Sequence, residues 1–137
     1  MRLLRLMAAA ILLGCAVTAN AELARADTTR LQALLEQGVP VIDVRTEAEW
    51  KHTGVVPGSH RITFFDAKGN YDFRAWLDEL NRIVKPDEPF VLICQTGMRS
   101  RSIGHVLSKK LGYKAVYDAH EGVQGWLKRK LPTTKQW

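Results

Sequence analysis

Short apolar runs and amphipathic stretches alternate along this chain. Residues 39–44 and 90–93 are almost wholly apolar, which is typical of strands buried on both faces, and shorter strands are predicted at 61–63 and 114–117. Apolar residues at helical spacing predict helices at 27–37 and 73–84, a helical turn at 46–50, a helix closed by Gly112 and a terminal helix ending near Pro132. The alternation predicts an α/β fold with a central parallel sheet flanked by helices on both faces.

Cys94 lies at the junction between the apolar run 90–93 and the next helix. Residues 103–111 carry the apolar face of that helix, and Ser100 or Ser102 is expected to cap its start. Ligands of parallel α/β sheets bind outside the carboxyl ends of the strands. The thiol is therefore expected at the edge of the sheet where this fold class binds ligands.

The residues beside Cys94 suit a reactive thiol. Only the thiolate of cysteine is a good nucleophile, and a free thiol with a pKa of about 8.5 is mostly protonated at neutral pH. Amide groups at the helix start, together with Arg99 and Arg101, favour the anion. The alternative role is that of a small buried hydrophobic residue, and two neighbouring arginines argue against it.

Three stretches carry a family resemblance. Cys94-Gln95-Thr96-Gly97-Met98-Arg99 resembles the C-x-x-G-x-R active-site loop of the rhodanese (sulfurtransferase) family. Two further landmarks follow the family's order: V-I-D-V-R at 41–45, with Glu49-Trp50 and Pro57-Gly58 behind it, and E-G-V-Q-G-W at 121–126. The resemblance spans residues 31–131 and implies one rhodanese-like domain.

The resemblance, together with the pattern of the first residues, divides the chain. A leader at 1–21 and a lead-in at 22–30 precede the domain at 31–131, and a tail follows at 132–137. Without the leader the chain keeps 116 residues. That length is enough for one domain with its own core and too short for the tandem two-domain form of the family.

The resemblance implies a two-step transfer of sulfur. The Cys94 thiolate attacks the outer sulfur of a donor such as thiosulfate, sulfite leaves, and cyanide or a thiol then takes the sulfur from a Cys94 persulfide. The residues expected to bind the substrate follow Cys94 directly: Gln95, Thr96, Gly97, Met98, Arg99, Ser100 and Arg101. Arg99 is expected to hold the sulfonate, with Arg101 either second or solvated at the helix start. No tightly bound cofactor is implied.

Two other functional classes have similar features. Dual-specificity phosphatases carry a loop that resembles His-Cys-x5-Arg. Here Ile93 precedes the cysteine and four residues separate Cys94 from Arg99, which argues against phosphatase activity. A persulfide carrier that hands sulfur to another protein needs the same loop as the enzyme, so the sequence leaves both of these open.

Several polar residues follow the predicted strands. Asp43 and Arg45 are interpreted as a structural ion pair or turn-capping pair, and Thr46 and Glu49 have the spacing of a capping box. His120 is the histidine that topology brings nearest the thiol, and it has either a direct role or a solvated loop position. The Cys and His residues show no metal-ligand spacing, so no metal site is predicted.

The first 21 residues have the three parts of a secretory signal peptide. Two arginines precede a short apolar stretch, and Ala19-Asn20-Ala21 is a small-residue cleavage site. The apolar stretch is too short for a comfortable membrane span. Cleavage after Ala21 and a periplasmic product are expected. The alternative is Leu12-Leu13-Gly14-Cys15, which resembles a bacterial lipoprotein box and leaves Cys15 as a lipid anchor.

Charge and cysteine content depend on this leader. Loss of Arg2 and Arg5 with residues 1–21 leaves 18 Lys and Arg against 14 Asp and Glu, so the net charge falls from +6 to +4. This mild balance suits a small anionic substrate and not the clustered basic surface of a nucleic-acid binder. Cys94 is then unpaired in an oxidising compartment, where a thiol is a liability unless it is used.

Overall fold

The computed structural model describes residues 21–137, so Cys15 and the predicted signal sequence up to residue 20 lie outside the described residues. The elements are β1 (Ala24–Ala26), α1 (Thr28–Glu36), β2 (Val41–Asp43), α2 (Glu47–Thr53), β3 (His60–Arg61), α3 (Phe73–Asn81), β4 (Phe90–Ile93), α4 (Met98–His105), the π-helix η1 (Val106–Lys110), β5 (Val116–Ala119) and α5 (Gly122–Lys128). Within residues 21–137, no helix has the length and apolar character needed to cross a membrane.

Five parallel strands form one sheet in the order β1-β5-β4-β2-β3. The strand before the cysteine, β4, is the middle one, and its Leu92 pairs with Ile42 on one side and Asp118 on the other. Because all neighbours run in the same direction, their carboxyl ends meet at one edge of the sheet. Cys94 follows β4 at that edge.

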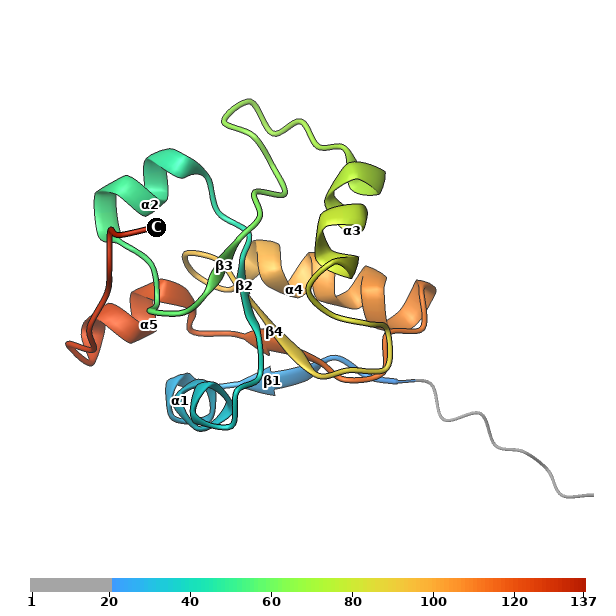
Figure 1. Ribbon diagram of the computed structural model, residues 1–137, viewed down its shortest axis with the longest axis horizontal. Helices are drawn as coiled ribbons and strands as arrows, with labels where there is room; N and C mark the ends of the chain where they lie inside the picture. Colours follow the sequence, from blue (N-terminus) through green and yellow to red (C-terminus); the bar gives the residue numbers. More distant parts are fainter. Residues whose placement is uncertain (1–20) are drawn as a thin grey trace, which may run out of the picture.

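Helices cover both faces of the sheet (Figure 1). Successive side chains of a strand point to opposite faces. Val91 and Ile93 pack into the core formed with α1 and α5, whereas Phe90 and Leu92 pack into the core formed with α3 and α4. Burial of β4 on both faces explains its unbroken apolar run, and the predicted fold class is confirmed.

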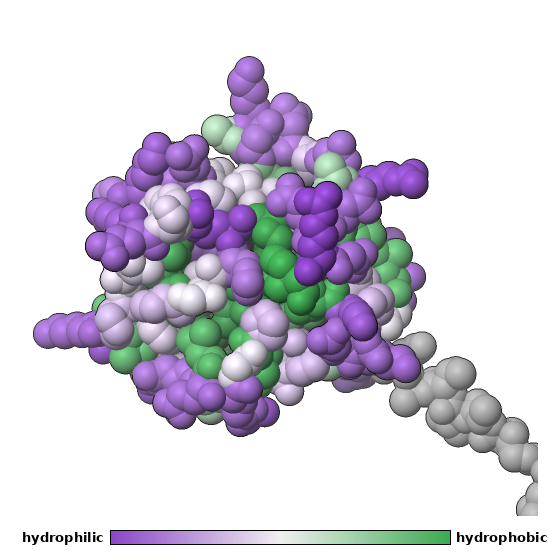
Figure 2. Space-filling model, in the orientation of Figure 1, coloured by the Kyte–Doolittle hydropathy of each residue, from purple (hydrophilic) through white to green (hydrophobic). Residues whose placement is uncertain are grey.

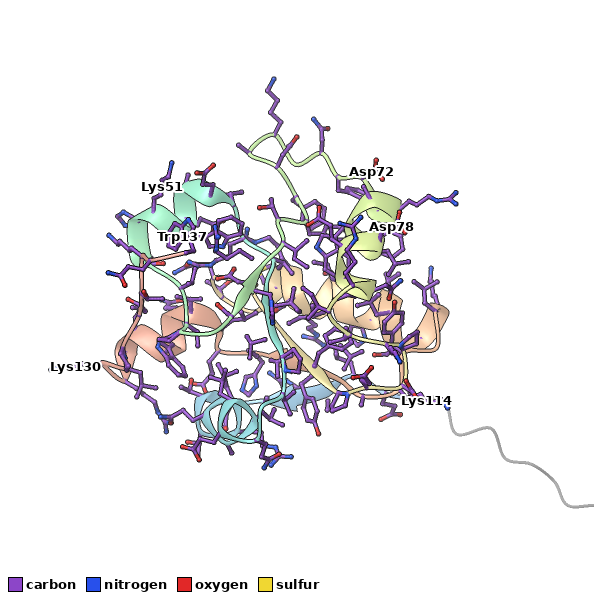
Figure 3. All side chains as sticks on the ribbon, in the orientation of Figure 1. Lys51, Asp72, Asp78, Lys114, Lys130 and Trp137 are labelled. Carbon is purple, nitrogen blue, oxygen red and sulfur yellow. The ribbon has the colours of Figure 1, made fainter. Side chains whose placement is uncertain are left out.

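The carboxyl-terminal segment folds back onto the domain. Val55 and Thr134 form an antiparallel bridge, and Figure 3 shows Trp137 beside α2. The Arg61 guanidinium lies 5.2 Å from the ring centroid of Trp50 and 4.5 Å from that of Trp137. Residues 132–137, predicted as a tail, therefore contact β3 and α2.

Charged side chains are spread over the periphery. Lys51, Lys114 and Lys130 lie at well-separated points of the molecule in Figure 3. Figure 2 shows hydrophilic residues around the rim of the same face and a smaller hydrophobic area in its middle. Such a mixture is ordinary, because apolar atoms contribute more than half of a folded protein's surface.

Strand bounds differ from the sequence prediction where pairing decides them. The last strand is Val116–Ala119 instead of 114–117, so Asp118 belongs to the strand and not to the loop after it. The short strand β3 is His60–Arg61 instead of 61–63. β1 lies within the predicted lead-in at 22–30. No local pattern marks its three residues as a strand, and they form one because they pair with β5.

Helix bounds differ from the prediction at the start of α4 and at the ends of α2 and α3. α4 begins at Met98, and its cap is Gly97 in the left-handed conformation, not Ser100 or Ser102. α3 ends at Asn81 instead of residue 84. The capping box of Thr46 and Glu49 is confirmed, with both reciprocal hydrogen bonds present at the start of α2.

Candidate active site

Cys94 sits at the centre of a short loop between β4 and α4. It is the only cysteine among residues 21–137, and it is 1% exposed. The Gly97 backbone N–H donates to its Sγ at 3.1 Å, and the Ser100 Oγ lies 3.5 Å from the same sulfur. A backbone donor aimed at sulfur favours a negative charge there.

The first turn of α5 holds the start of this loop. The Val123 N–H donates to the Cys94 carbonyl at 2.9 Å, and the Gln124 N–H donates to the Gln95 carbonyl at 3.0 Å. In Figure 1 the gold loop before α4 lies between α2 and α5. Because these two carbonyl oxygens accept hydrogen bonds from α5, they are turned away from the sulfur. The backbone N–H of Gly97 faces the sulfur instead.

Two glycines make this close approach feasible. Gly97 has a φ of +98°, and a Cβ there would lie 2.3 Å from the His120 carbonyl oxygen. Gly122 has a φ of +63°, and a Cβ there would lie 2.3 Å from the Gln95 carbonyl oxygen. The sequence analysis gave Gly97 a place in the loop but did not assign Gly122 the task of docking it. The presence of Gly122 in the E-G-V-Q-G-W stretch was the signal in the sequence that could have indicated this role.

Asp43 and Arg45 form the predicted structural ion pair. Both side chains are fully buried, and the Arg45 Nη2 lies 2.9 Å from the Asp43 Oδ2. Arg45 also donates to the Gln95 Oε1 at 2.9 Å, to the Thr53 Oγ1 at 2.9 Å and to the Gly54 carbonyl at 3.0 Å. The pair therefore fixes the Gln95 side chain from the side opposite α5.

Arg99, predicted to hold the substrate's sulfonate, is bound by Glu49. Its Nη2 and Nη1 donate to the two Glu49 carboxylate oxygens at 2.6 and 2.9 Å. These bonds lower the pKa of Glu49 to about 2, against the effect of partial burial and with further help from Thr46. The same hydrogen bonds raise the pKa of Arg99. The sequence analysis missed this pairing, because the two residues are 50 positions apart.

The other predicted substrate-binding residues divide into two groups. Ser100 is buried beside the sulfur, and Gln95 is held by Arg45. Thr96, Met98 and Arg101 are exposed. His120 is half-buried beside the loop through its carbonyl, and its Nδ1 is buried without a hydrogen-bond partner among the described residues. The structure thus places His120 near the rim, as predicted, with its backbone making the contact with Gly97.

One hollow adjoins the loop and a second adjoins α4. One of about 340 Å³ is formed by the outer side of α2 and Gln95, with Glu49 and His52 in its wall. The other, of about 550 Å³, runs along α4 and is lined mainly by apolar side chains, among them Phe64 and Ile103. Within residues 21–137, no three Cys, His, Asp or Glu side chains are grouped to hold a metal ion.

The sequence profile described as "Rhodanese-like domain" matches residues 27–129. The chain therefore belongs to the rhodanese family, and the matched residues include the Cys94 loop. The match begins and ends within a few residues of the domain predicted at 31–131.

Curated relatives include two sulfurtransferases. The thiosulfate sulfurtransferase GlpE of Glaesserella parasuis is 27% identical over 92 residues, which cover 67% of this chain and 74% of that protein. The thiosulfate sulfurtransferase of Corynebacterium glutamicum is 32% identical over 97 residues, but these cover 58% of this chain and 32% of that longer protein. Both of these relatives are thus sulfurtransferases, and their identity to this chain is low.

Solved structures share the fold. The polysulfide-sulfur transferase homodimer of Wolinella succinogenes matches with a TM-score of 0.63 and 23% identity, covering 82% of this chain and 78% of that one. A rhodanese-related protein of Thermoplasma volcanium matches with a TM-score of 0.59 and 21% identity, covering 82% of this chain and 99% of that one. At these identities the likeness establishes the rhodanese-like architecture alone.

Gly97→Ala should destabilise the protein by more than the cost of placing alanine at a positive φ. A non-glycine residue in the left-handed region costs about 1–2 kcal/mol, and here the new Cβ would also meet the His120 carbonyl. The free energy of unfolding in urea should therefore fall by more than this. Gly69→Ala is the matched control, because its φ is +81° and its Cβ would meet no atom of the described residues within 4 Å. Equal losses in both variants would show that the contact with His120 is unimportant.

Glu49→Gln should reduce the sensitivity of the fold to acid. Because the pKa of Glu49 is lowered from 4.5 to about 2, its ion pair contributes stability above pH 4.5 that is lost as the pH falls through about 2. Gln keeps the capping box. The wild type should exceed the variant by about 0.2–1 kcal/mol at neutral pH, as for a partly exposed pair, and the difference should vanish near pH 2.

The measurement is urea unfolding across that pH range. Glu47→Gln, in the same helix, is the control, since its partner Lys51 and its own side chain are about two-thirds exposed. If both variants show the same pH profile, the Arg99 contact contributes nothing specific.

Proposed function

We propose that this protein moves sulfane sulfur from thiosulfate, or a similar anionic donor, through a Cys94 persulfide to cyanide or a thiol. The observation that carries the proposal is the Gly97 amide aimed at the Cys94 Sγ at 3.1 Å, in a loop whose first carbonyls are turned away. That geometry suits a sulfur that is anionic before and after transfer. The curated relatives that are sulfurtransferases support the same reaction class.

The proposed chemistry balances in two steps. The Cys94 thiolate attacks the outer sulfur of thiosulfate, a sulfur–sulfur bond to Cys94 forms, and the bond to the sulfonate breaks so that sulfite leaves with its electron pair. Cyanide or a thiolate then attacks the outer sulfur of the persulfide. Thiocyanate or a new persulfide leaves, and the Cys94 thiolate is restored.

The Glu49–Arg99 ion pair supports a second candidate, a persulfide carrier that turns over free thiosulfate poorly. Arg99 is the one arginine of the C-x-x-G-x-R stretch, and both of its Nη atoms already donate to Glu49. A dianion such as thiosulfate must compete with that carboxylate for the guanidinium. A singly charged persulfide donor depends less on Arg99, and the carrier role requires only such a donor.

Cys94→Ser should abolish sulfur transfer while the fold is kept. Serine is nearly isosteric with cysteine, but its hydroxyl is a far weaker nucleophile without a neighbouring base. Wild-type protein incubated with thiosulfate should gain the mass of one sulfur atom and lose it on addition of cyanide, as read by intact-mass spectrometry. A serine variant that retains full transfer would remove Cys94 from the reaction.

Assays of sulfur transfer with different donors distinguish the enzyme from the carrier. Steady production of thiocyanate from thiosulfate and cyanide supports the enzyme. A protein that takes sulfur from a low-molecular-weight persulfide, yet barely from thiosulfate, supports the carrier. Failure to gain sulfur from either donor contradicts both.

We also propose that the chain is exported and processed after Ala21, on the basis of the arginine-flanked apolar start and the Ala19-Asn20-Ala21 site. Intact-mass analysis of the periplasmic fraction of an expressing bacterium should show a product that begins at Glu22. A lipid-modified product that begins at Cys15 would replace this proposal with an anchored protein.

A further inference from the structure

A buried carboxyl group lies behind the reacting thiol, with one hydroxyl between them. The Ser100 Oγ is 2.7 Å from the Asp118 Oδ1 and 3.5 Å from the Cys94 Sγ. Ser100 and Asp118 are 0% exposed, and Cys94 is 1% exposed. The three side chains therefore form a row that runs from the active-site loop, through the first turn of α4, to the sheet strand β5.

The central hydroxyl has a single proton to donate. When Ser100 donates to an ionised Asp118, its oxygen can accept a hydrogen bond from the Cys94 S–H. When Asp118 is protonated, it can donate to Ser100, whose own proton then points to a Cys94 thiolate. Both arrangements contain the same number of protons and one negative charge.

The surroundings of Asp118 favour a proton on its carboxyl group. Burial raises the pKa of Asp118, against the Ser100 hydrogen bond and the charges of His120, Arg25 and Arg101. Its Oδ2 is buried and has no hydrogen-bond partner among the described residues. A buried carboxylate with a bare oxygen is costly, so a proton on this group relieves the cost.

The charged neighbours of Asp118 come from three surrounding elements. The adjacent strand β1 contributes Arg25, α4 contributes Arg101, and the loop after β5 contributes His120. Arg99 acts on Cys94 itself, and its charge is shared with Glu49. On the other side of β5, the paired residue of β4 is the apolar Leu92. Arg25 and Arg101 are exposed, His120 is half-buried, and Arg99 is shared with Glu49. The hydroxyl of Ser100 is the group that joins acid and thiol.

We propose that Ser100 and Asp118 are positioning residues that set the charge state of Cys94, with Asp118 as the proton acceptor for the thiol. The Cys94 S–H bond breaks, Ser100 takes that proton, and Ser100 passes its own proton to the Asp118 Oδ1. No charge is created, because the negative charge moves from oxygen to sulfur. Both the thiolate and the persulfide are anions, so Asp118 stays protonated through sulfur transfer.

The test measures the Cys94 thiolate directly and does not depend on the sulfur donor. Thiolate absorbance in the ultraviolet is followed against pH for the full chain, and the curve of the matching Cys94→Ser protein is subtracted to remove Cys15 and tyrosine signals. In the wild type, coupling to Asp118 should spread thiolate formation over two steps. Asp118→Asn should show one step. Its midpoint should lie about one pH unit or more below the upper wild-type step, because the amide carries no negative charge that opposes the thiolate.

Two serine variants complete the design. Ser100→Ala removes the hydroxyl that joins the groups, so the lower step should shrink or disappear. Ser102→Ala is the matched control, since this exposed serine of the same helix bonds only to the Met98 carbonyl within the described residues, and its curve should equal that of the wild type. Single-step curves that coincide in wild type, Asp118→Asn and Ser100→Ala would overturn the proposal.

A stability measurement covers the case in which a variant folds poorly. A raised folded-state pKa means that Asp118 favours the fold fully below its ordinary value of 3.8, and that this contribution is lost as the pH rises through the folded value. Asp118→Asn should therefore gain unfolding free energy relative to the wild type as the pH rises through that window. A loss of stability that is constant with pH would mean that Asp118 serves only as a hydrogen-bond acceptor. Failure of sulfur transfer with the thiolate steps intact would count against the proposed function alone.

Discussion

The buried ion pair of Asp43 and Arg45 is the constraint on which the site depends. A fully buried arginine is tolerated only when its donors are satisfied, because an unpaired buried charge costs several kcal/mol. Arg45 meets this demand with groups from β2, from the end of α2 and from the side chain of Gln95. The need to satisfy one guanidinium therefore locks the loop residue next to Cys94 to the neighbouring strand and helix.

The opposite side of the loop is held by backbone groups alone. The first amides of α5 bind the carbonyls of Cys94 and Gln95, and the glycines at 97 and 122 let backbone approach backbone where a Cβ would collide. With its carbonyls taken by α5, the loop presents an amide to the sulfur. The three family landmarks thus act together. The second along the chain is the loop that carries Cys94, and the first and third hold that loop on its two sides.

Local patterns in the sequence predicted the features that depend on residues close together along the chain. The apolar run of β4 placed Cys94 at the edge of the sheet, and the spacings of Asp43 with Arg45 and of Thr46 with Glu49 predicted contacts that the structure contains. The pairing of Glu49 with Arg99 joins residues 50 positions apart, and the place of Asp118 depends on strand pairing with β4 and β1. Such contacts follow from the tertiary fold, so no local pattern could show them.

These contacts explain how a nearly enclosed sulfur can carry charge. Among the described residues the loop offers it an amide from Gly97 and a hydroxyl from Ser100, while the cation of Arg99 is shared with Glu49. Fixed dipoles stabilise an anion without a full opposite charge beside it. A bare cation would hold a dianion more tightly than a singly charged anion. Sharing of Arg99 with Glu49 therefore weakens this preference for a dianion.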